Sequence, residues 1–326
     1  MTLESLIEQT KANLEAEWEL TDLGEPVKIV GIEITLRDCS ITISQWCYLE
    51  SILRKEGMDN ANTVGMLLDP NIVLEPNLDG DVSNRSNSYA RLIGELQFLA
   101  NATRPDITYA ISQLLSYTAN PTMQHVTALK RVLRYLSGTK TYVITYSDIL
   151  DHPNHFYSYA DAAFTNADDQ KSTSGYVFMM AGGAITWFSK KQTITALSSM
   201  EAEYTALSEA VREGHWLRSL FFKLGFTQVL PTMIWGDNEG SIAMMKNPQF
   251  HKRSKHIGLQ YHSIREQVHK GEIIVKNCRT QNQTMDVLTK PLPHAKHRQH
   301  KDGYGCEYFE AESRRGFGAT SQGGYI

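Results

Sequence analysis

The sequence predicts an α/β protein whose main part is a mixed five-stranded sheet flanked by helices, preceded by a smaller α+β and helical region. Three observations predict this fold class. Between residues 155 and 188, segments with the apolar alternation of strands follow one another closely. A long helical pattern covers residues 200–224, and strand-like and helical segments alternate after it. Consecutive strands followed by alternating helices and strands favour one mixed sheet with helices packed on it.

The composition is that of an ordinary soluble protein. Its 326 residues, of which 41% are hydrophobic, are enough for one large or two medium domains. The formal net charge of −4 neither indicates nor excludes nucleic acid as a partner. The cysteines form no C-x-x-C pair, which argues against a zinc site and favours reduced thiols in the cytoplasm or nucleus. No apolar run approaches the roughly 18 residues of a membrane span, so no membrane partner is expected.

The first part of the chain divides into three segments. Residues 1–68 begin with an acidic, helix-like stretch, continue with two alternating strand patterns in 27–44 and end in a helix at 48–56. Residues 69–88 are rich in Asp, Asn, Pro, Gly and Ser, which indicates a linker or loop. Residues 89–141 form a helical connection segment. Its helices are expected at 89–101, 106–119 and 123–136.

The second part, residues 142–292, is predicted to be the main domain. Its strands are expected at 155–160, 173–180, 184–188, 232–236 and 271–277. The long helix 200–224 ends before Gly225, a residue that commonly follows a helix. After Pro293 the periodicity is lost and the composition becomes rich in Gly, Lys, His and Arg. Residues 293–326 are therefore predicted to be a disordered tail.

Three aspartates lie close to predicted element ends. Asp161 is expected just past the strand 155–160, and Asp237 directly follows the strand 232–236. A strand end is a rigid platform from which a carboxylate can be aimed at a crevice. Asp286 follows the last strand among apolar neighbours. Taken singly, the first two are better explained as turn formers or helix caps, and Asp286 as a charge at a helix N-terminus.

The long helix offers two glutamates, and its apolar stripe separates them. The stripe has spacings of three and four residues and consists of Leu207, Ala210, Gly214, Leu217, Phe221 and Leu224. Four residues before Leu207 stands Glu203, which is therefore on the sheet-facing side, whereas Glu201 begins a polar row. A carboxylate at the start of a buried stripe is costly unless something compensates it, such as a metal ion. We therefore select Glu203.

These four carboxylates, if they converge on one crevice, would form a site for two divalent cations about 4 Å apart. Such cations bind a scissile phosphate, activate an attacking water and stabilise the leaving oxygen. Oxygen ligands without a His–Cys set favour Mg²⁺ or Mn²⁺ over zinc.

The motifs around these carboxylates resemble the ribonuclease H domain of copia-type LTR retrotransposon Pol polyproteins. The motifs, in the family's order, include Tyr159-Ala-Asp-Ala-Ala163, Lys171-Ser-Thr-Ser-Gly-Tyr-Val-Phe178, Ala196-Leu-Ser-Ser-Met-Glu-Ala-Glu-Tyr-Thr-Ala-Leu207, Gly236-Asp-Asn238 and Leu288-Thr-Lys-Pro-Leu292. The resemblance implies a ribonuclease H-like fold for residues 142–292. It places the family's catalytic and metal-binding carboxylates on Asp161, Glu203, Asp237 and Asp286, with two Mg²⁺ or Mn²⁺ ions.

The first part resembles the end of the reverse transcriptase region of the same polyprotein. The matching motifs are Thr21-Asp-Leu-Gly24, Gly31-Ile-Glu33, Tyr89-Ala-Arg-Leu-Ile-Gly94, Thr103-Arg-Pro-Asp-Ile107 and Arg131-Val-Leu-Arg-Tyr-Leu136. The family's polymerase needs a palm with a paired-Asp motif on a hairpin, and Asp168-Asp169 lies in a polar loop instead. No polymerase activity is expected from this fragment alone. The missing polymerase portion of the polyprotein is an expected partner, within a retroelement particle.

The resemblance also implies a substrate, the RNA strand of an RNA–DNA hybrid, hydrolysed endonucleolytically and recognised by shape and phosphates. The candidate substrate contacts are Lys190, Lys191, Asn238, Arg253, Lys255 and His256. The basic residues among them are equally well explained as a solvated charged loop, whereas Asn238 is better explained as a helix cap. An alternative function is that of a catalytically inactive, truncated remnant that only binds nucleic acid. Met200 and Met285, which flank the carboxylates and depart from the family pattern, fit either function.

Overall fold

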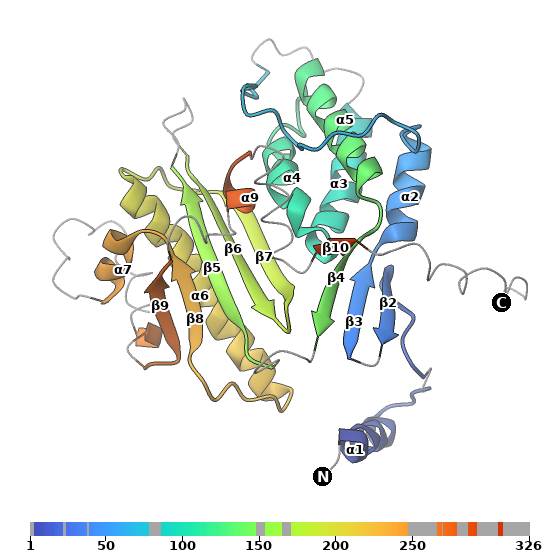
Figure 1. Cartoon of the computed structure of the whole chain (residues 1–326), viewed down its shortest axis with the longest axis vertical. Helices are drawn as coiled ribbons and strands as arrows, with labels where there is room; N and C mark the ends of the chain where they lie inside the picture. Colours follow the sequence, from blue (N-terminus) through green and yellow to red (C-terminus); the bar gives the residue numbers. More distant parts are fainter. Residues whose placement is uncertain are drawn as a thin grey trace, which may run out of the picture.

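The computed structural model describes residues 3–21, 24–37, 39–77, 86–147, 154–164, 171–246, 266–268, 270–278, 286–291 and 306–308. These residues build two five-stranded sheets, with helices packed on each (Figure 1). None of the described helices is both long and apolar enough to cross a lipid bilayer.

The first sheet is antiparallel throughout and has the order β1-β2-β3-β4-β10. Its strands are β1 (Lys28–Ile29), β2 (Ile32–Arg37), β3 (Ser40–Ser44), β4 (Tyr142–Ser147) and β10 (Cys306–Tyr308). The β2–β3 hairpin follows the predicted alternation, and Ile34 pairs with Ile43. At the end of β3, the Glu33 carboxylate accepts hydrogen bonds from Ser44 Oγ at 2.8 Å and from Trp46 N at 2.7 Å. Glu33 therefore satisfies a free N–H group at the start of the next helix.

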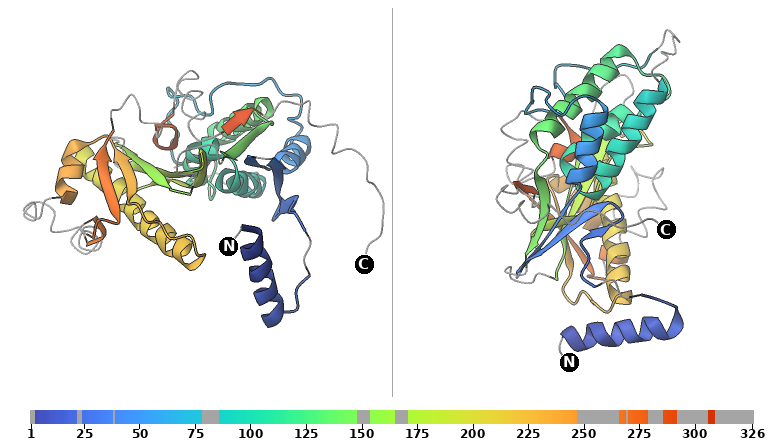
Figure 2. Two further views of the ribbon diagram at one scale, coloured as in Figure 1. Left: turned by 60° about the horizontal axis from the view of Figure 1, so that its bottom comes forward. Right: turned by 90° about the vertical axis from the view of Figure 1, so that its right-hand side faces the viewer.

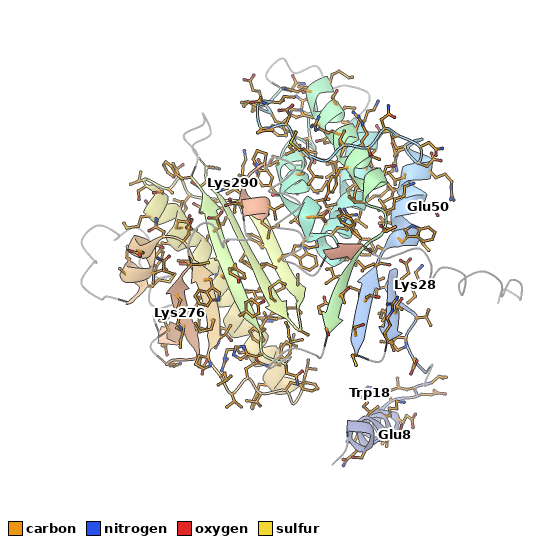
Figure 3. The ribbon with its side chains drawn as sticks, in the orientation of Figure 1. Glu8, Trp18, Lys28, Glu50, Lys276 and Lys290 are labelled. Atoms are coloured by element: carbon orange, nitrogen blue, oxygen red, sulfur yellow. The ribbon has the colours of Figure 1, made fainter. Side chains whose placement is uncertain are left out.

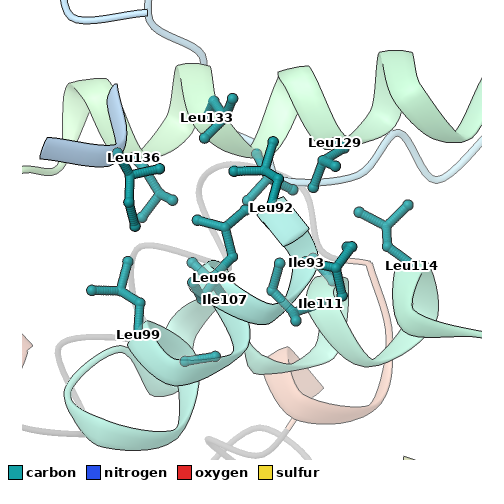
Figure 4. Packing of buried hydrophobic residues seen from close by; sticks show 14 of the residues in the cluster. Leu92, Ile93, Leu96, Leu99, Ile107, Ile111, Leu114, Leu129, Leu133 and Leu136 are labelled. Carbon is teal, nitrogen blue, oxygen red and sulfur yellow. The ribbon is translucent and has the colours of Figure 1, made fainter. Parts of the chain in front are cut away.

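Five helical segments pack beside this sheet. They are α2 (Trp46–Lys55), α3 (Ser86–Ala102), the 3₁₀ turn η1 (Pro105–Ile107), α4 (Thr108–Leu115) and α5 (Met123–Gly138). Their shared core is rich in leucine and isoleucine at spacings of three and four residues, such as Leu92, Leu96 and Leu99 on α3 (Figure 4). The helix α1 (Leu3–Glu17) lies apart from both sheets (Figure 2).

A buried ion pair fixes the junction between α3 and η1. Arg104 is 2% exposed and donates from Nε and Nη2 to the two carboxylate oxygens of Asp106, at 2.8 and 2.7 Å. Tyr135 on α5 donates its hydroxyl to Asp106 at 2.8 Å, and Arg104 also donates to the carbonyl of Thr139 at 3.1 Å. This network ties η1 to the end of α5.

The second sheet has the order β7-β6-β5-β8-β9. Its strands are β5 (Tyr157–Ala163), β6 (Thr173–Met180), β7 (Gly183–Lys191), β8 (Thr232–Gly236) and β9 (Ile273–Asn277). The first three are antiparallel neighbours, while β8 runs parallel to β5 and β9 parallel to β8. If the five strands are numbered 1 to 5 along the chain, from β5 to β9, their order across the sheet is 3-2-1-4-5. The predicted α/β class with a ribonuclease H-like mixed sheet is confirmed.

One face of the second sheet is covered by α6 (Ser199–Lys223), and Figure 2 shows this helix running along the strands. Leu207, Ala210 and Leu217 of the predicted stripe lie in the core beneath it. Phe178 and Ile234 from the strands join them, with Phe156, which directly precedes β5. Gly214 permits a close approach, because a Cβ there would lie 3.2 Å from the Phe178 ring. The stripe ends earlier than predicted, since Leu224 is 61% exposed.

The other face of this sheet packs against the first part of the chain. Trp187 on β7 donates its indole N–H to the carbonyl of Ala100 on α3 at 2.7 Å. Tyr146 on β4 lies over Gly183, where a Cβ would come within 2.6 Å of the tyrosine ring. The second sheet is therefore covered on both faces.

The structure differs from the predicted boundaries in two places. β4, which was assigned to the domain 142–292, pairs with β3 in the first sheet, so the second sheet begins with β5. Within the predicted disordered tail 293–326, Cys306–Tyr308 form β10 against β4. Both differences depend on pairing between distant segments, which local periodicity does not encode.

Candidate active site

The sequence predicts Asp161 just past a strand, but the structure places it inside β5. β5 extends to Ala163 because it pairs with β6 as far as Thr173, and Asp161 stands opposite Gly175. The side chain is buried, and its Oδ2 accepts a hydrogen bond from Thr289 Oγ1 at 2.5 Å. The central strand of the sheet thus holds this carboxylate in a fixed position.

Glu203 lies on the sheet-facing side of α6, as its spacing from Leu207 predicted. The helix begins with Ser198 as N-cap, whose hydroxyl accepts a hydrogen bond from Glu201 N. Glu201 in turn accepts a hydrogen bond from Leu197 N at 2.8 Å, so this glutamate completes the cap. Glu203 is buried, and among the described residues its Oε2 has no hydrogen-bond partner.

Asp237 directly follows β8 and is half-buried. β5 and β8 are parallel neighbours, so Asp161 and Asp237 come to the same edge of the sheet. Oxygen atoms of Asp161, Glu203 and Asp237 all lie within 4.8 Å of one another. Three of the four predicted carboxylates therefore form one cluster.

Asp286, the fourth, begins the one-turn helix α9 (Asp286–Thr289) beside this cluster. It forms an ion pair with Lys290, whose Nζ is 2.6 Å from Asp286 Oδ1. α9 lies tightly on β6, because a Cβ at Gly175 would be 2.9 Å from Thr289 Cγ2. Thr289 and Lys290 are site residues that the sequence did not reveal. The spacing of four residues between Asp286 and Lys290 could have indicated this ion pair, because residues four apart lie on the same face of a helix.

The cluster shifts the titration of its own members. Burial and the neighbouring Asp161 and Asp237 raise the pKa of Glu203 to about 10. Burial, together with Asp237 and Asp286, raises the pKa of Asp161 to about 6, although the bond from Thr289 and the charge of Lys290 oppose the shift. Burial also raises the pKa of Asp237. The site without a cation therefore favours protonated carboxyl groups.

These shifts predict that the cation-free protein loses stability as pH rises. The pKa of Glu203 rises from its ordinary 4.5 to about 10 in the folded chain, and that of Asp161 from 3.8 to about 6. At pH values between the ordinary and the raised pKa of each group, the folded chain holds more protons than the unfolded chain. The free energy of unfolding therefore falls with rising pH across these windows. We expect the unfolding temperature in a chelator to fall between about pH 5 and pH 8, and Mg²⁺ to offset the loss. Glu203→Gln, which cannot ionise, should flatten the slope. A wild-type slope equal to that of this variant would contradict the assignment.

The residues present fit a divalent cation. Glu203 Oε2 is buried and has no hydrogen-bond partner among the described residues, and the Glu203 carboxylate has an oxygen within 4.8 Å of those of Asp161 and Asp237. Such a group of like charges is stable when a cation neutralises it. All the donors are oxygen atoms, which suits hard cations such as Mg²⁺.

The predicted substrate contacts have different outcomes. Lys190 is exposed and Lys191 is half-buried. Both lie at the end of β7, close to the level of Asp161 on β5. Asn238 accepts a hydrogen bond from Ser241 N at 2.9 Å, so its carbonyl oxygen caps α7 (Glu239–Lys246), the plainer of the two predicted roles. Arg253, Lys255 and His256 lie outside the described residues.

Comparisons with known proteins find sequence relatives among transposon-encoded proteins. No family model matches the sequence. The chain is 37% identical over 288 residues to the retrovirus-related Pol polyprotein from transposon RE1 of Arabidopsis thaliana, a match that covers 88% of this chain and 19% of that polyprotein. It is 30% identical over 213 residues to a putative transposon Ty5-1 protein of Saccharomyces cerevisiae, covering 64% of this chain and 68% of that protein. The crystal structure of LC11-RNase H1 in complex with an RNA/DNA hybrid matches 41% of this chain and 93% of that chain, with 14% identity and a TM-score of 0.31.

The sequence matches extend across both sheets. The chain spans about a fifth of the length of the Pol polyproteins that it matches, which were the relatives predicted from its motifs. The chain therefore belongs to the Pol polyprotein family of copia-type retrotransposons.

Proposed function

We propose that this chain is a ribonuclease H that hydrolyses the RNA strand of RNA–DNA hybrids with the help of divalent cations. The observation that supports it most directly is the cluster of Asp161, Glu203 and Asp237 at one edge of a ribonuclease H-like sheet, with a buried Glu203 oxygen that has no hydrogen-bond partner among the described residues. A structural ion-pair network would satisfy that oxygen with a donor. The family membership is consistent with this activity, because Pol polyproteins are the relatives.

Each group of the site has a task in this proposal. Asp161, Glu203 and Asp237, joined by Asp286, would hold two Mg²⁺ or Mn²⁺ ions, which supply Lewis-acid stabilisation of phosphate charge. β5 and β8 keep Asp161 and Asp237 rigid, and α6 holds Glu203 against them. Lys190 and Lys191 would contact backbone phosphates. They lie on β7, two strands from Asp161, roughly 10 Å away at the usual strand spacing.

Hydrolysis assays on four labelled nucleic acids, three duplexes and one single strand, test this proposal. An RNA–DNA hybrid, double-stranded RNA, double-stranded DNA and single-stranded RNA would be offered to the full chain with Mg²⁺, with Mn²⁺ or with a chelator. We expect metal-dependent cleavage of the RNA strand of the hybrid alone. The shape of the hybrid and its 2′-hydroxyls are the features that such a site reads.

A folded protein that binds the hybrid but leaves it uncut with either cation would overturn the proposal. That result would favour the alternative function, a remnant that only binds nucleic acid. Circular dichroism on the same preparation shows whether the chain is folded. The salt dependence of hybrid affinity would then report how many phosphates the chain contacts.

A further inference from the structure

Lys290 places a positive charge beside Asp286, at the carboxylate site. Lys290 directly follows α9, beside the second sheet (Figure 3). Its Nζ lies 2.6 Å from Asp286 Oδ1. In the region that the structure describes, the site thus contains its own cation. This ammonium occupies the part of the site where Asp286 would meet a divalent ion.

The position of Lys290 is set by a rigid support. The single turn of α9 is closed by a hydrogen bond from Lys290 N to Asp286 O at 3.0 Å. Val287 and Leu288 anchor the turn in a buried cluster with Val177 and Met179 of β6. The neighbouring Thr289 donates to Asp161. The adjacent residues Thr289 and Lys290 therefore contact two of the carboxylates, Asp161 and Asp286.

The ammonium can nevertheless leave. The side chain of Lys290 is 42% exposed, whereas that of Asp286 is 11% exposed. A long, flexible lysine side chain at such a position can turn toward solvent while its methylenes stay on the protein. Asp286 can therefore exchange an ammonium for a divalent cation without movement of the backbone.

We propose that Lys290 is a built-in counter-ion of the carboxylate site, which stabilises it without metal and competes with the divalent cation at Asp286. This inference rests on the proposed metal-dependent function. Binding of the cation and formation of the Lys290–Asp286 ion pair then oppose each other, and by linkage each weakens the other equally. Lys290 is a positioning residue in this scheme and sets how tightly the metal binds.

Mn²⁺ binding to the full chain, measured by calorimetry, tests the proposal together with thermal unfolding in a chelator. Lys290→Met removes the charge and keeps most of the side-chain length. We expect it to bind Mn²⁺ roughly 10-fold more tightly, about 1.4 kcal/mol, because a competing charge is gone. We also expect a lower unfolding temperature in the chelator, because the carboxylates lose their counter-ion. Lys290→Arg, which retains the charge, should stay near wild type in both measurements.

Lys223→Met is the matched control. Lys223 is exposed at the far end of α6, so its loss changes the net charge equally without touching the site. Equal or weaker Mn²⁺ binding by Lys290→Met, beside normal binding by wild type, would overturn the role of Lys290 and leave the proposed function standing. Absence of Mn²⁺ binding from both proteins would overturn both proposals. If Lys290→Met bound Mn²⁺ and wild type did not, the result would support competition so strong that Lys290 excludes the cation from the wild-type site.

Discussion

Replacing Asp161 by asparagine is expected to abolish hybrid cleavage, with a loss of roughly 1,000-fold or more, about 4 kcal/mol of transition-state stabilisation. Asparagine has the same shape and can still accept the hydrogen bond from Thr289, so the strand and α9 should keep their positions. What is lost is the negative charge on the central strand. The rate of RNA-strand cleavage at saturating Mg²⁺, compared between the two proteins, measures the effect.

The same substitution should not destabilise the protein. Burial and neighbouring carboxylates oppose the ionised form of Asp161, and the neutral amide removes that repulsion. The unfolding temperature in a chelator should therefore equal or exceed that of wild type. Glu203→Gln should lose cleavage in the same way, whereas Glu201→Gln, on the cap side of α6, should retain it. Cleavage by Asp161→Asn at a wild-type rate would disprove the assignment of this site.

Arg104→Met is expected to have the largest effect on stability, about 3–5 kcal/mol of the free energy of unfolding. The substitution leaves Asp106, which is fully buried, without its bidentate partner. The hydroxyl of Tyr135 alone cannot compensate a buried carboxylate. Denaturant unfolding followed by circular dichroism measures the change.

An exposed arginine provides the control for this prediction. Arg54 on α2 pairs with Glu50 at 3.5 Å, and its side chain is 71% exposed. Arg54→Met should change the free energy of unfolding by less than about 1 kcal/mol, because solvent screens such pairs. If the two variants were equally stable, the Arg104–Asp106 pair would be structurally unimportant. The double substitution Arg104→Met with Asp106→Asn should recover part of the loss.

The sequence was sufficient for those parts of the site that follow from local periodicity. The stripe of α6 separated Glu203 from Glu201, because residues four apart share one face of a helix. The structure places Glu203 in the cluster and Glu201 in the cap. The position of Asp237 followed from the apolar run before it, which ends where β8 ends.

Other parts could not be predicted because they depend on contacts between distant segments. The end of β5 is set by pairing with β6, so Asp161 falls within the strand. The contacts of Thr289 and Lys290 depend on how α9 docks against Gly175, which no local pattern specifies. The same holds for β4, whose alternation is compatible with either sheet and whose partner is β3.

The position of β4 has a consequence for how the chain is assembled. β4 pairs with β3 on one side and on the other with β10, which follows the whole second sheet in the chain. The second sheet is thus an insertion between two neighbouring strands of the first. A pairing of such high contact order closes late, because the long intervening chain must first become compact. During synthesis, the edge of β4 would stay open until β10 leaves the ribosome, an interval in which another nascent chain can pair with it.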